Sequence, residues 1–157
     1  MIVKEECFIK ALEERRIDAI MHQSNCFHKM GAGVAKDIAK AFPVAYFADQ
    51  QSNCGALEKL GTFTKAELGN GGFVYNLYGQ YTYGRDSKQT DYSYLLGAFR
   101  KAVGDALSHG CRTIGIPYKM GCNNAGGDWE VVKRFVIEPV ENMYQDGEVT
   151  IICFIKK

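Results

Sequence analysis

The sequence lacks a long hydrophobic run, an N-terminal leader and an excess of charge of either sign. No apolar run approaches the ~20 residues of a membrane span, and the first residues have neither the apolar core nor the cleavage site of a signal peptide. We therefore expect an intracellular, cytoplasmic protein without a membrane partner. The 19 lysines and arginines are scattered and nearly balance the 18 acidic residues, so the charge favours no nucleic-acid partner.

Paired cysteines and clustered histidines are also missing. The six cysteines stand singly, without a C-x-x-C pair, and only three histidines are present. These spacings exclude the common zinc-site patterns and a disulfide framework, and they fit a reducing compartment. The sequence therefore predicts no metal site and no cofactor.

The order of expected elements predicts the fold class. At 157 residues, 46% of them hydrophobic, the chain is long enough for a single domain over residues 1–157, which we expect to be a monomer. The pattern of apolar residues predicts strands over residues 1–4, 17–21, 60–68, 72–77, 113–116 and 149–155, and helices over residues 7–14, 34–42, 44–53, 91–109 and 129–144. Because strands alternate with helices, we expect an α/β fold with a mainly parallel sheet in a three-layer α/β/α sandwich.

A glycine-rich turn joins the second expected strand to a helix. Residues 30–33 read Met-Gly-Ala-Gly, and the helix follows at once. The first N–H groups of a helix and the positive end of its dipole favour an anion. Glycine pairs at such turns are often purely structural, and neither common nucleotide motif fits: Lys36 stands where a dinucleotide fingerprint has its third glycine or alanine, and the P-loop ending is absent.

A second glycine-rich loop follows the expected strand over residues 113–116. Residues 118–124 read Tyr-Lys-Met-Gly-Cys-Asn-Asn, and a further loop over residues 78–84 follows another strand. Ligands of parallel sheets bind beyond the carboxyl ends of the strands. We therefore expect these three loops to form one crevice, with a pyrophosphate held between the two glycine-rich loops.

Two side chains are candidates for activating water. His22 lies at a strand end beside the expected crevice, and its imidazole could take a proton near neutral pH; a structural role is the alternative. Asp128 could activate water, or it could cap the helix that begins at Trp129. Asn25 could bond ribose hydroxyls or its own loop, and for Cys122 we favour a packing or backbone-donor role.

Together these segments resemble the macrodomains, a family of ADP-ribose-binding modules with a mixed sheet between helices. The resemblance rests on Asn-Cys at 25–26, Met-Gly-Ala-Gly-Val-Ala at 30–35 and Ile-Pro-Tyr-Lys-Met-Gly-Cys at 116–122. Tyr-Asn-Leu-Tyr-Gly-Gln at 75–80 and Ala-Gly-Gly-Asp-Trp at 125–129 are similar to the branch of microbes and phages that includes ADP-ribose-1″-phosphate phosphatases.

The resemblance implies a small-molecule ligand, ADP-ribose or its 1″-phosphate, and raises His22 as a catalytic residue. It places Asn25 at the distal ribose and Asp18 or its neighbours nearer the adenine. The residues expected to contact the ligand are Asn25, Gly31, Ala32, Gly33, Val34, Gln80, Tyr118, Met120, Gly121, Cys122, Asn123 and Asn124.

Two departures bear on the activity. Lys-Glu-Glu-Cys at 4–7 replaces the family's Gly-Asp pair, and the lysine and aspartate of related ADP-ribosyl hydrolases are absent, with Ala125 at the aspartate position. The expected activity is therefore hydrolysis of ADP-ribose-1″-phosphate, with His22 or Asp128 activating water. The alternatives are a non-catalytic ADP-ribose reader and a hydrolase that removes ADP-ribose from modified protein or nucleic acid.

Overall fold

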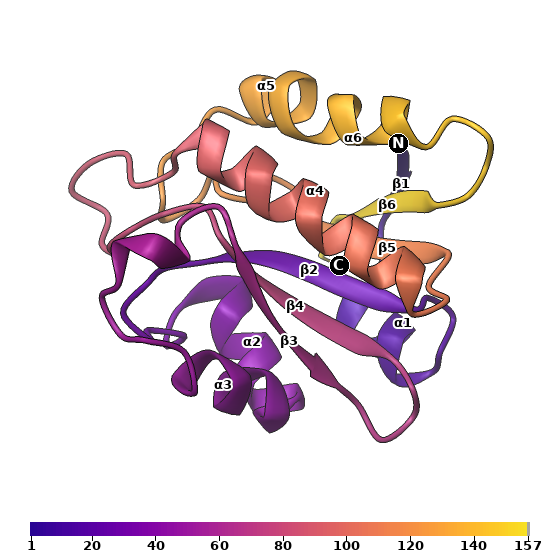
Figure 1. Ribbon diagram of the computed structural model, residues 1–157, viewed down its shortest axis with the longest axis horizontal. Helices are drawn as coiled ribbons and strands as arrows, with labels where there is room; N and C mark the ends of the chain where they lie inside the picture. The colour runs from indigo at the N-terminus through magenta and orange to yellow at the C-terminus, as the bar shows by residue number, and fades with distance from the viewer. Residues whose placement is uncertain (157) are drawn as a thin grey trace.

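A mixed six-stranded sheet forms the centre of the molecule in the computed structural model, which describes residues 1–156 (Figure 1). The strands are β1 (Ile2–Lys4), β2 (Ala19–Ser24), β3 (Phe63–Glu67), β4 (Phe73–Tyr78), β5 (Thr113–Pro117) and β6 (Thr150–Phe154). Their order is β1-β6-β5-β2-β4-β3, and β3 pairs antiparallel with β4 while the other neighbours are parallel. The expected mixed, mainly parallel sheet is confirmed.

Helices cover both faces of this sheet. They are α1 (Phe8–Glu13), α2 (Gly33–Ala41), α3 (Pro43–Gln50), the short 3₁₀ turn η1 (Leu57–Lys59), α4 (Tyr92–Ser108), α5 (Trp129–Val131), the π-helical η2 (Val132–Ile137) and α6 (Glu138–Met143). Figure 1 shows α1, α2 and α3 on one face and α4, α5 and α6 on the other. This is the three-layer α/β/α sandwich that the sequence predicts.

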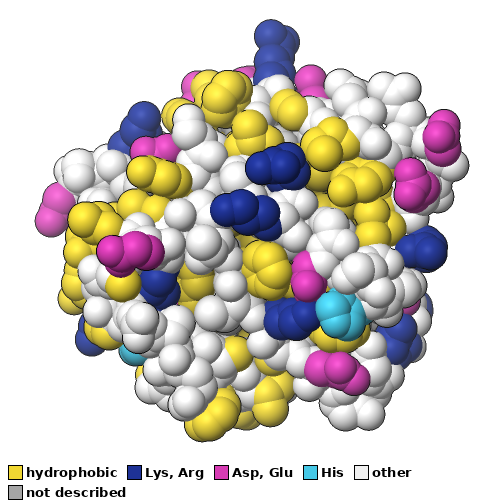
Figure 2. Space-filling view, in the orientation of Figure 1, with side chains coloured by type: hydrophobic (Ala, Val, Ile, Leu, Met, Phe, Trp, Pro, Cys, Tyr) yellow, Lys and Arg dark blue, Asp and Glu magenta, His cyan; other side chains and the backbone are white. Residues whose placement is uncertain are grey.

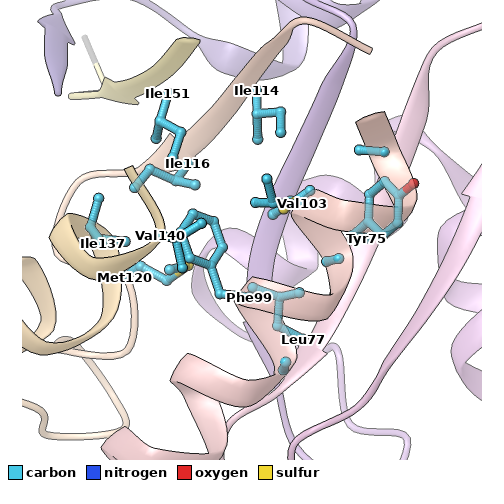
Figure 3. Close-up of a cluster of buried hydrophobic side chains, with 14 of the residues drawn as sticks. Tyr75, Leu77, Phe99, Val103, Ile114, Ile116, Met120, Ile137, Val140 and Ile151 are labelled. Carbon is cyan, nitrogen blue, oxygen red and sulfur yellow. The ribbon is translucent and has the colours of Figure 1, made fainter. Parts of the chain in front are cut away.

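Alternating side chains of the buried strands separate two apolar cores. On β2, Ala19 and Met21 face the α4 side, whereas Ile20 belongs to the cluster beneath α1, α2 and α3. Figure 3 shows the core on the α4 side, where Phe99 and Val103 of α4 pack among side chains from β4, β5 and the C-terminal helices. A strand buried on both faces is what a central parallel strand requires.

Helix α4 has the ends that its sequence predicts. Asp91 accepts hydrogen bonds from the N–H groups of Ser93 and Tyr94, and Gly110 has a φ of 85° just beyond the last turn.

The C-terminal helix differs from the prediction, because its middle widens into the π-helical η2. Pro139 explains the change: it has no N–H to donate, and its ring crowds the carbonyl one turn earlier.

The molecular surface is mixed in character. On the face shown in Figure 2, basic and acidic side chains are interspersed with apolar and uncharged ones. Among the described residues, no helix is long and apolar enough to cross a membrane.

Candidate functional site: a cleft at the carboxyl ends of the strands

The loops that follow β2, β4 and β5 meet around a cleft of about 410 Å³. This volume is in the range of small-molecule sites. The predicted convergence of three loops at the carboxyl edge of the sheet is confirmed. The expected ligand residues that line the cleft are Asn25, Gly31, Ala32, Gly33, Val34, Gln80, Tyr118, Met120, Gly121, Asn123 and Asn124, and His22 lies in its wall.

The first loop is braced by its own asparagine. Asn25 Oδ1 accepts a hydrogen bond from the Phe27 N–H (2.9 Å), and its Nδ2 donates to the Lys29 carbonyl (2.8 Å). The side chain is 6% exposed and still borders the cleft. Asn25 therefore shapes the loop, as one of its two sequence interpretations proposes, at a place where ligand contact is also possible.

The N-terminus of α2 opens onto the cleft. The helix has nine residues and begins at Gly33, whose φ of 58° favours glycine. Its N-cap is Ala32, whose methyl group cannot accept a hydrogen bond from the first turn. A Cβ on Gly33 would lie 3.7 Å from Asn124 Nδ2, so the two glycine-rich loops closely face each other. This arrangement leaves helix N–H groups for an anion.

Hydrogen bonds join the end of β2, the loop after β4 and the second glycine-rich loop. Gln23 Nε2 donates to Gln80 Oε1 (2.7 Å) and Thr90 Oγ1 (2.9 Å), and the Thr90 hydroxyl donates to the Gly121 carbonyl (2.5 Å). Gly79 makes this closeness possible, because a Cβ there would come 2.5 Å from Gln23 Oε1. The rim of the cleft is therefore fixed by side chains from β2 and from the loop after β4, together with a backbone carbonyl of the second glycine-rich loop.

Three cations line the cleft: Lys29, Arg85 and Lys119. None of the described lining residues is an aspartate or glutamate, and no ion pair within the described chain engages any of the three. The local charge is therefore positive although the whole chain is nearly neutral. The sequence analysis did not predict that these three cations line the cleft. Lys29 and Lys119 could have been suspected, because they lie within the two glycine-rich loops.

His22 is buried in the wall, with 1% of its surface exposed. Its Nε2 lies 2.7 Å from Asn76 Oδ1, and in the described chain no group is in hydrogen-bonding range of the buried Nδ1. Burial lowers the pKa of His22 to about 4, although the Asn76 bond acts in the opposite direction. The imidazole is therefore neutral at physiological pH.

Two expected site residues lie outside the described lining. Asp128 caps α5 by accepting a hydrogen bond from the Glu130 N–H (2.9 Å), and it is exposed. The Cys122 thiol contacts the Met120 carbonyl (3.4 Å), and burial raises its pKa to about 11. Cys122 is therefore a protonated thiol that packs beside the core, and the catalytic role of Asp128 stays a prediction.

A second pocket of about 400 Å³ adjoins the cleft. The shared wall consists of Gly33, Val34, Pro117, Tyr118, Lys119 and Asn123. The far side of the second pocket combines apolar side chains, Phe8 and Phe154 among them, with the charged side chains of Glu6, Asp37 and Lys156. Two pockets with the α2 N-terminus between them suit an elongated ligand whose anionic centre lies in the middle.

Asp18 does not lie near either pocket. It precedes β2 at the opposite edge of the sheet, where its Oδ2 accepts hydrogen bonds from the Arg112 N–H (2.7 Å) and the Thr113 N–H (3.1 Å). The expectation that Asp18 approaches an adenine is therefore wrong. A residue at the amino end of a parallel strand lies at the sheet edge opposite the carboxyl-end loops.

The sequence is similar to a known protein family and to a phage protein. The family model described as Macro domain matches residues 21–136. An uncharacterized 17.5 kDa protein from the tk-vs intergenic region of Enterobacteria phage T4 is 31% identical over 119 residues, covering 73% of this chain and 74% of that protein.

Solved macrodomain structures share the fold. The macrodomain of Mycobacterium tuberculosis DarG has a TM-score of 0.77 at 15% identity, covering 98% of this chain and 95% of that one. A Trypanosoma brucei macrodomain in complex with ADP-ribose has a TM-score of 0.72 at 17% identity, covering 98% and 62%. With the family model matching most of its length, the chain belongs to the Macro domain family.

Proposed function

We propose that the protein binds ADP-ribose across the two adjoining pockets and hydrolyses ADP-ribose-1″-phosphate to ADP-ribose and phosphate. The observation that carries the proposal is the charge of the cleft. Lys29, Arg85 and Lys119 line it together with the N-terminus of α2, and no described lining residue is acidic. Such a site favours a ligand with more than one phosphate group.

The shapes of the pockets suggest the orientation of the ligand. The diphosphate would lie at the shared wall, against the N–H groups that begin α2 and beside Lys119. The second pocket suits the adenine ring, because Phe8 and Phe154 in its lining offer apolar surface to a flat ring. The distal ribose and its 1″-phosphate would then lie in the first cleft, near Asn25 and Arg85.

The proposed reaction is attack of water on the terminal phosphorus, with cleavage of its bond to the 1″ oxygen. The backbone N–H groups and cations would stabilise charge on the phosphoryl oxygens. The attacking water would give a proton to Nδ1 of neutral His22, and the 1″ oxygen, once its bond to phosphorus breaks, would take a proton from solvent water to become the ribose hydroxyl. His22 would then return its proton to solvent. His22 is favoured over Asp128 because it belongs to the wall of the cleft.

A second candidate function is a reader that captures ADP-ribose without hydrolysis. The observation that favours it is the burial of both His22 ring nitrogens: Nε2 bonds to Asn76, and Nδ1 has no contact with solvent. Asp128, the other candidate, is occupied as a helix cap. Turnover by His22 therefore requires water to reach Nδ1 once substrate is bound.

Phosphorus NMR of the protein mixed with ADP-ribose-1″-phosphate tests both functions in one sample. A growing inorganic phosphate signal supports the phosphatase. Shifted and broadened diphosphate signals without release of phosphate support the reader, and a parallel panel of ADP-ribosylated protein and nucleic acid would reveal cleavage of another ADP-ribosyl bond. Unchanged signals would contradict ADP-ribose binding by this cleft.

Replacing His22 by alanine tests its role directly. We expect His22→Ala to lower kcat by about 100-fold or more, as for loss of a general base, while the Kd for ADP-ribose changes little. Calorimetric titration and turnover assays measure the two effects. A matched loss of affinity would instead assign His22 to the architecture of the wall.

A further inference from the structure

We propose that Asn76 is a positioning residue that fixes the tautomer of His22, keeping a proton on Nε2 and leaving Nδ1 bare. The proposal extends the function proposed above, because the bare nitrogen is the atom that would accept a proton from water. The hydrogen bonds that carry it concern the protein alone. Its failure and the failure of the phosphatase proposal can therefore be told apart.

The orientation of the Asn76 amide follows from the groups around it. Asn76 is fully buried on β4, and its Nδ2 lies 3.0 Å from the Ala45 carbonyl oxygen of α3. A carbonyl can only accept a hydrogen bond, so the NH₂ group of Asn76 must face Ala45. The amide oxygen is thereby directed to His22 Nε2 at 2.7 Å, and this nitrogen must carry the proton.

A buried carboxylate, Asp49, determines the donors and acceptors at the other end of the same hydrogen-bond chain. Asp49 of α3 is fully buried, and its Oδ1 accepts a hydrogen bond from the Tyr78 hydroxyl (2.6 Å). Burial, followed by the bond to Asp49, raises the pKa of Tyr78 well above its usual range, so Tyr78 keeps its proton. Since that proton points to Asp49, the Thr64 hydroxyl donates to Tyr78 (2.8 Å) and accepts from Asn76 Nδ2 (3.1 Å).

The result is a chain of hydrogen bonds with a single direction. Protons point from His22 to Asn76, from Asn76 to Thr64, from Thr64 to Tyr78 and from Tyr78 to Asp49. Bonds in such a chain polarise one another. The chain of donors starts at the imidazole in the wall of the cleft and ends at the carboxylate of Asp49 on α3.

At the imidazole end of the chain, two buried polar atoms on the same strand lack a partner among the described residues. In residues 1–156, His22 Nδ1 and Ser24 Oγ both lack a hydrogen bond. Their side chains are two positions apart on the same face of β2, roughly 6.6 Å along the strand. A water that donates to Nδ1 and bonds to the serine hydroxyl would satisfy both atoms. The geometry therefore points to a water site at His22 Nδ1.

Charged groups around His22 do not set its protonation. The buried titratable side chains on the elements beside it are Asp49 of α3, Lys59 of η1 and Tyr78 of β4. Asp37 of α2 and Tyr46 of α3 are half-buried, and Lys36 and Lys40 of α2 are exposed. Burial and the Asn76 bond account for its pKa. The amide at position 76 is therefore the group to change.

Histidine ¹⁵N NMR of the unmodified protein gives the first test. Long-range proton–nitrogen correlations at neutral pH should show His22 with a proton on Nε2 and none on Nδ1, while His28 and His109 serve as references in the same spectrum. A proton on Nδ1, or a cationic ring, would overturn the proposal. This measurement needs neither a variant nor a substrate.

Asn76→Asp gives the second test. A carboxylate facing Nε2–H should raise the pH at which His22 titrates by about one to three units. Asn142→Asp, which adds the same charge at an exposed position of α6, should leave that titration unchanged. A folded Asn76→Asp protein with an unmoved His22 titration would mean that Asn76 is merely structural. If this variant does not fold, the spectrum of the unmodified protein decides.

The pH dependence of turnover connects the two proposals. In Asn76→Asp, the acidic limb of the rate profile should move upward with the His22 titration. If the unmodified protein releases no phosphate, the phosphatase proposal fails, whereas the NMR result still decides the tautomer. A rate profile that stays fixed while His22 titrates at a new pH would show that Asn76 does not act on turnover through His22.

Discussion

At the residue scale, Asp128 joins two contacts at the start of the C-terminal helical segment. Its carboxylate accepts a hydrogen bond from the Glu130 N–H, and its own N–H donates to the Tyr92 hydroxyl (2.9 Å). Only the first contact depends on the side chain. The carboxylate can therefore be removed while the second contact stays in place.

We expect Asp128→Ala to lower the free energy of unfolding by about 0.5–2 kcal/mol, the usual cost of a lost N-cap. Turnover should be retained, because the carboxylate lies outside the described lining of the cleft. Asp91→Ala, which removes the cap of α4, is the matched control for stability. Urea titration and a phosphate-release assay measure both effects, and selective loss of turnover in Asp128→Ala would give Asp128 the catalytic role instead.

Asp18 should make stability depend on pH in the acidic range. Burial raises its pKa, but hydrogen bonds from Arg112, Arg15 and Thr113 outweigh burial and hold the pKa below its usual value. A depressed pKa in the folded state means that the stabilisation is complete above the unfolded pKa of about 3.9. It is lost as pH falls through the folded pKa.

Asp18→Asn should accordingly cost about 1–2 kcal/mol at neutral pH, because a charged acceptor is replaced by a neutral one. The difference from the unmodified protein should shrink as the pH falls below about 4. Urea titrations across this pH range measure the difference. A constant difference at every pH would show that the charge of Asp18 is not the cause.

Individual site residues were predictable to different degrees. Asn25 and Gly33 could be found because loop chemistry and positive φ values restrict residue type. Arg85 could not, because a scattered cation gains a role only when the fold brings it to a cleft. Asn76 was also missed as a partner of His22, since only strand pairing sets the two side by side.

At the element scale, α2 combines a site for anions with a weak N-terminus. Its N-cap, Ala32, has an extended backbone that suits a capping side chain. Ala32→Asp should therefore stabilise the helix by about 0.5–2 kcal/mol. The same carboxylate would occupy the position expected for the diphosphate, so ADP-ribose affinity should fall on the order of tenfold or more.

Ala32→Ser separates these effects, because serine caps the helix without adding charge. Thermal unfolding and calorimetric titration of the two variants should show similar gains in stability and a much larger loss of affinity for aspartate. Equal affinities for the two variants would contradict anion binding at the start of α2.

Whole elements were easier to predict than their boundaries. Short apolar runs predicted β2, β4, β5 and β6, alternation predicted β3, and the three- and four-residue spacing predicted α4, because burial on a sheet imposes these periods directly. β2 begins at Ala19 and runs to Ser24, later than expected, because its polar last residues read as loop. The π-helical turn near Pro139 depends on how the helix accommodates the ring, which periodicity does not encode.

At the scale of the whole molecule, charge is local. The formal net charge is +1, yet one cleft collects three cations. Ionic screening acts over about 8 Å at physiological salt. Binding to this cleft should therefore weaken as salt rises, although the overall charge gives no hint of it.

We expect the Kd for ADP-ribose to rise with sodium chloride concentration, and more gently in Lys119→Gln, which has one fewer cation in the shared wall. Lys101→Gln, at an exposed position of α4, changes the net charge equally and should keep the slope of the unmodified protein. Calorimetric titrations at several salt concentrations measure the slopes. Identical slopes in all three proteins would rule out a contribution from Lys119.

The shared wall between the two pockets has a consequence for how affinity accumulates. A nucleoside monophosphate and a ribose phosphate would each occupy one pocket and each meet the same wall. When one diphosphate joins the two halves, binding of the first half holds the second at a high effective concentration beside its pocket. The second half then binds without a further loss of translational freedom. With the proposed ligand, this arrangement would favour intact ADP-ribose far more than its separate halves, and it would discriminate by connectivity as well as by chemical groups.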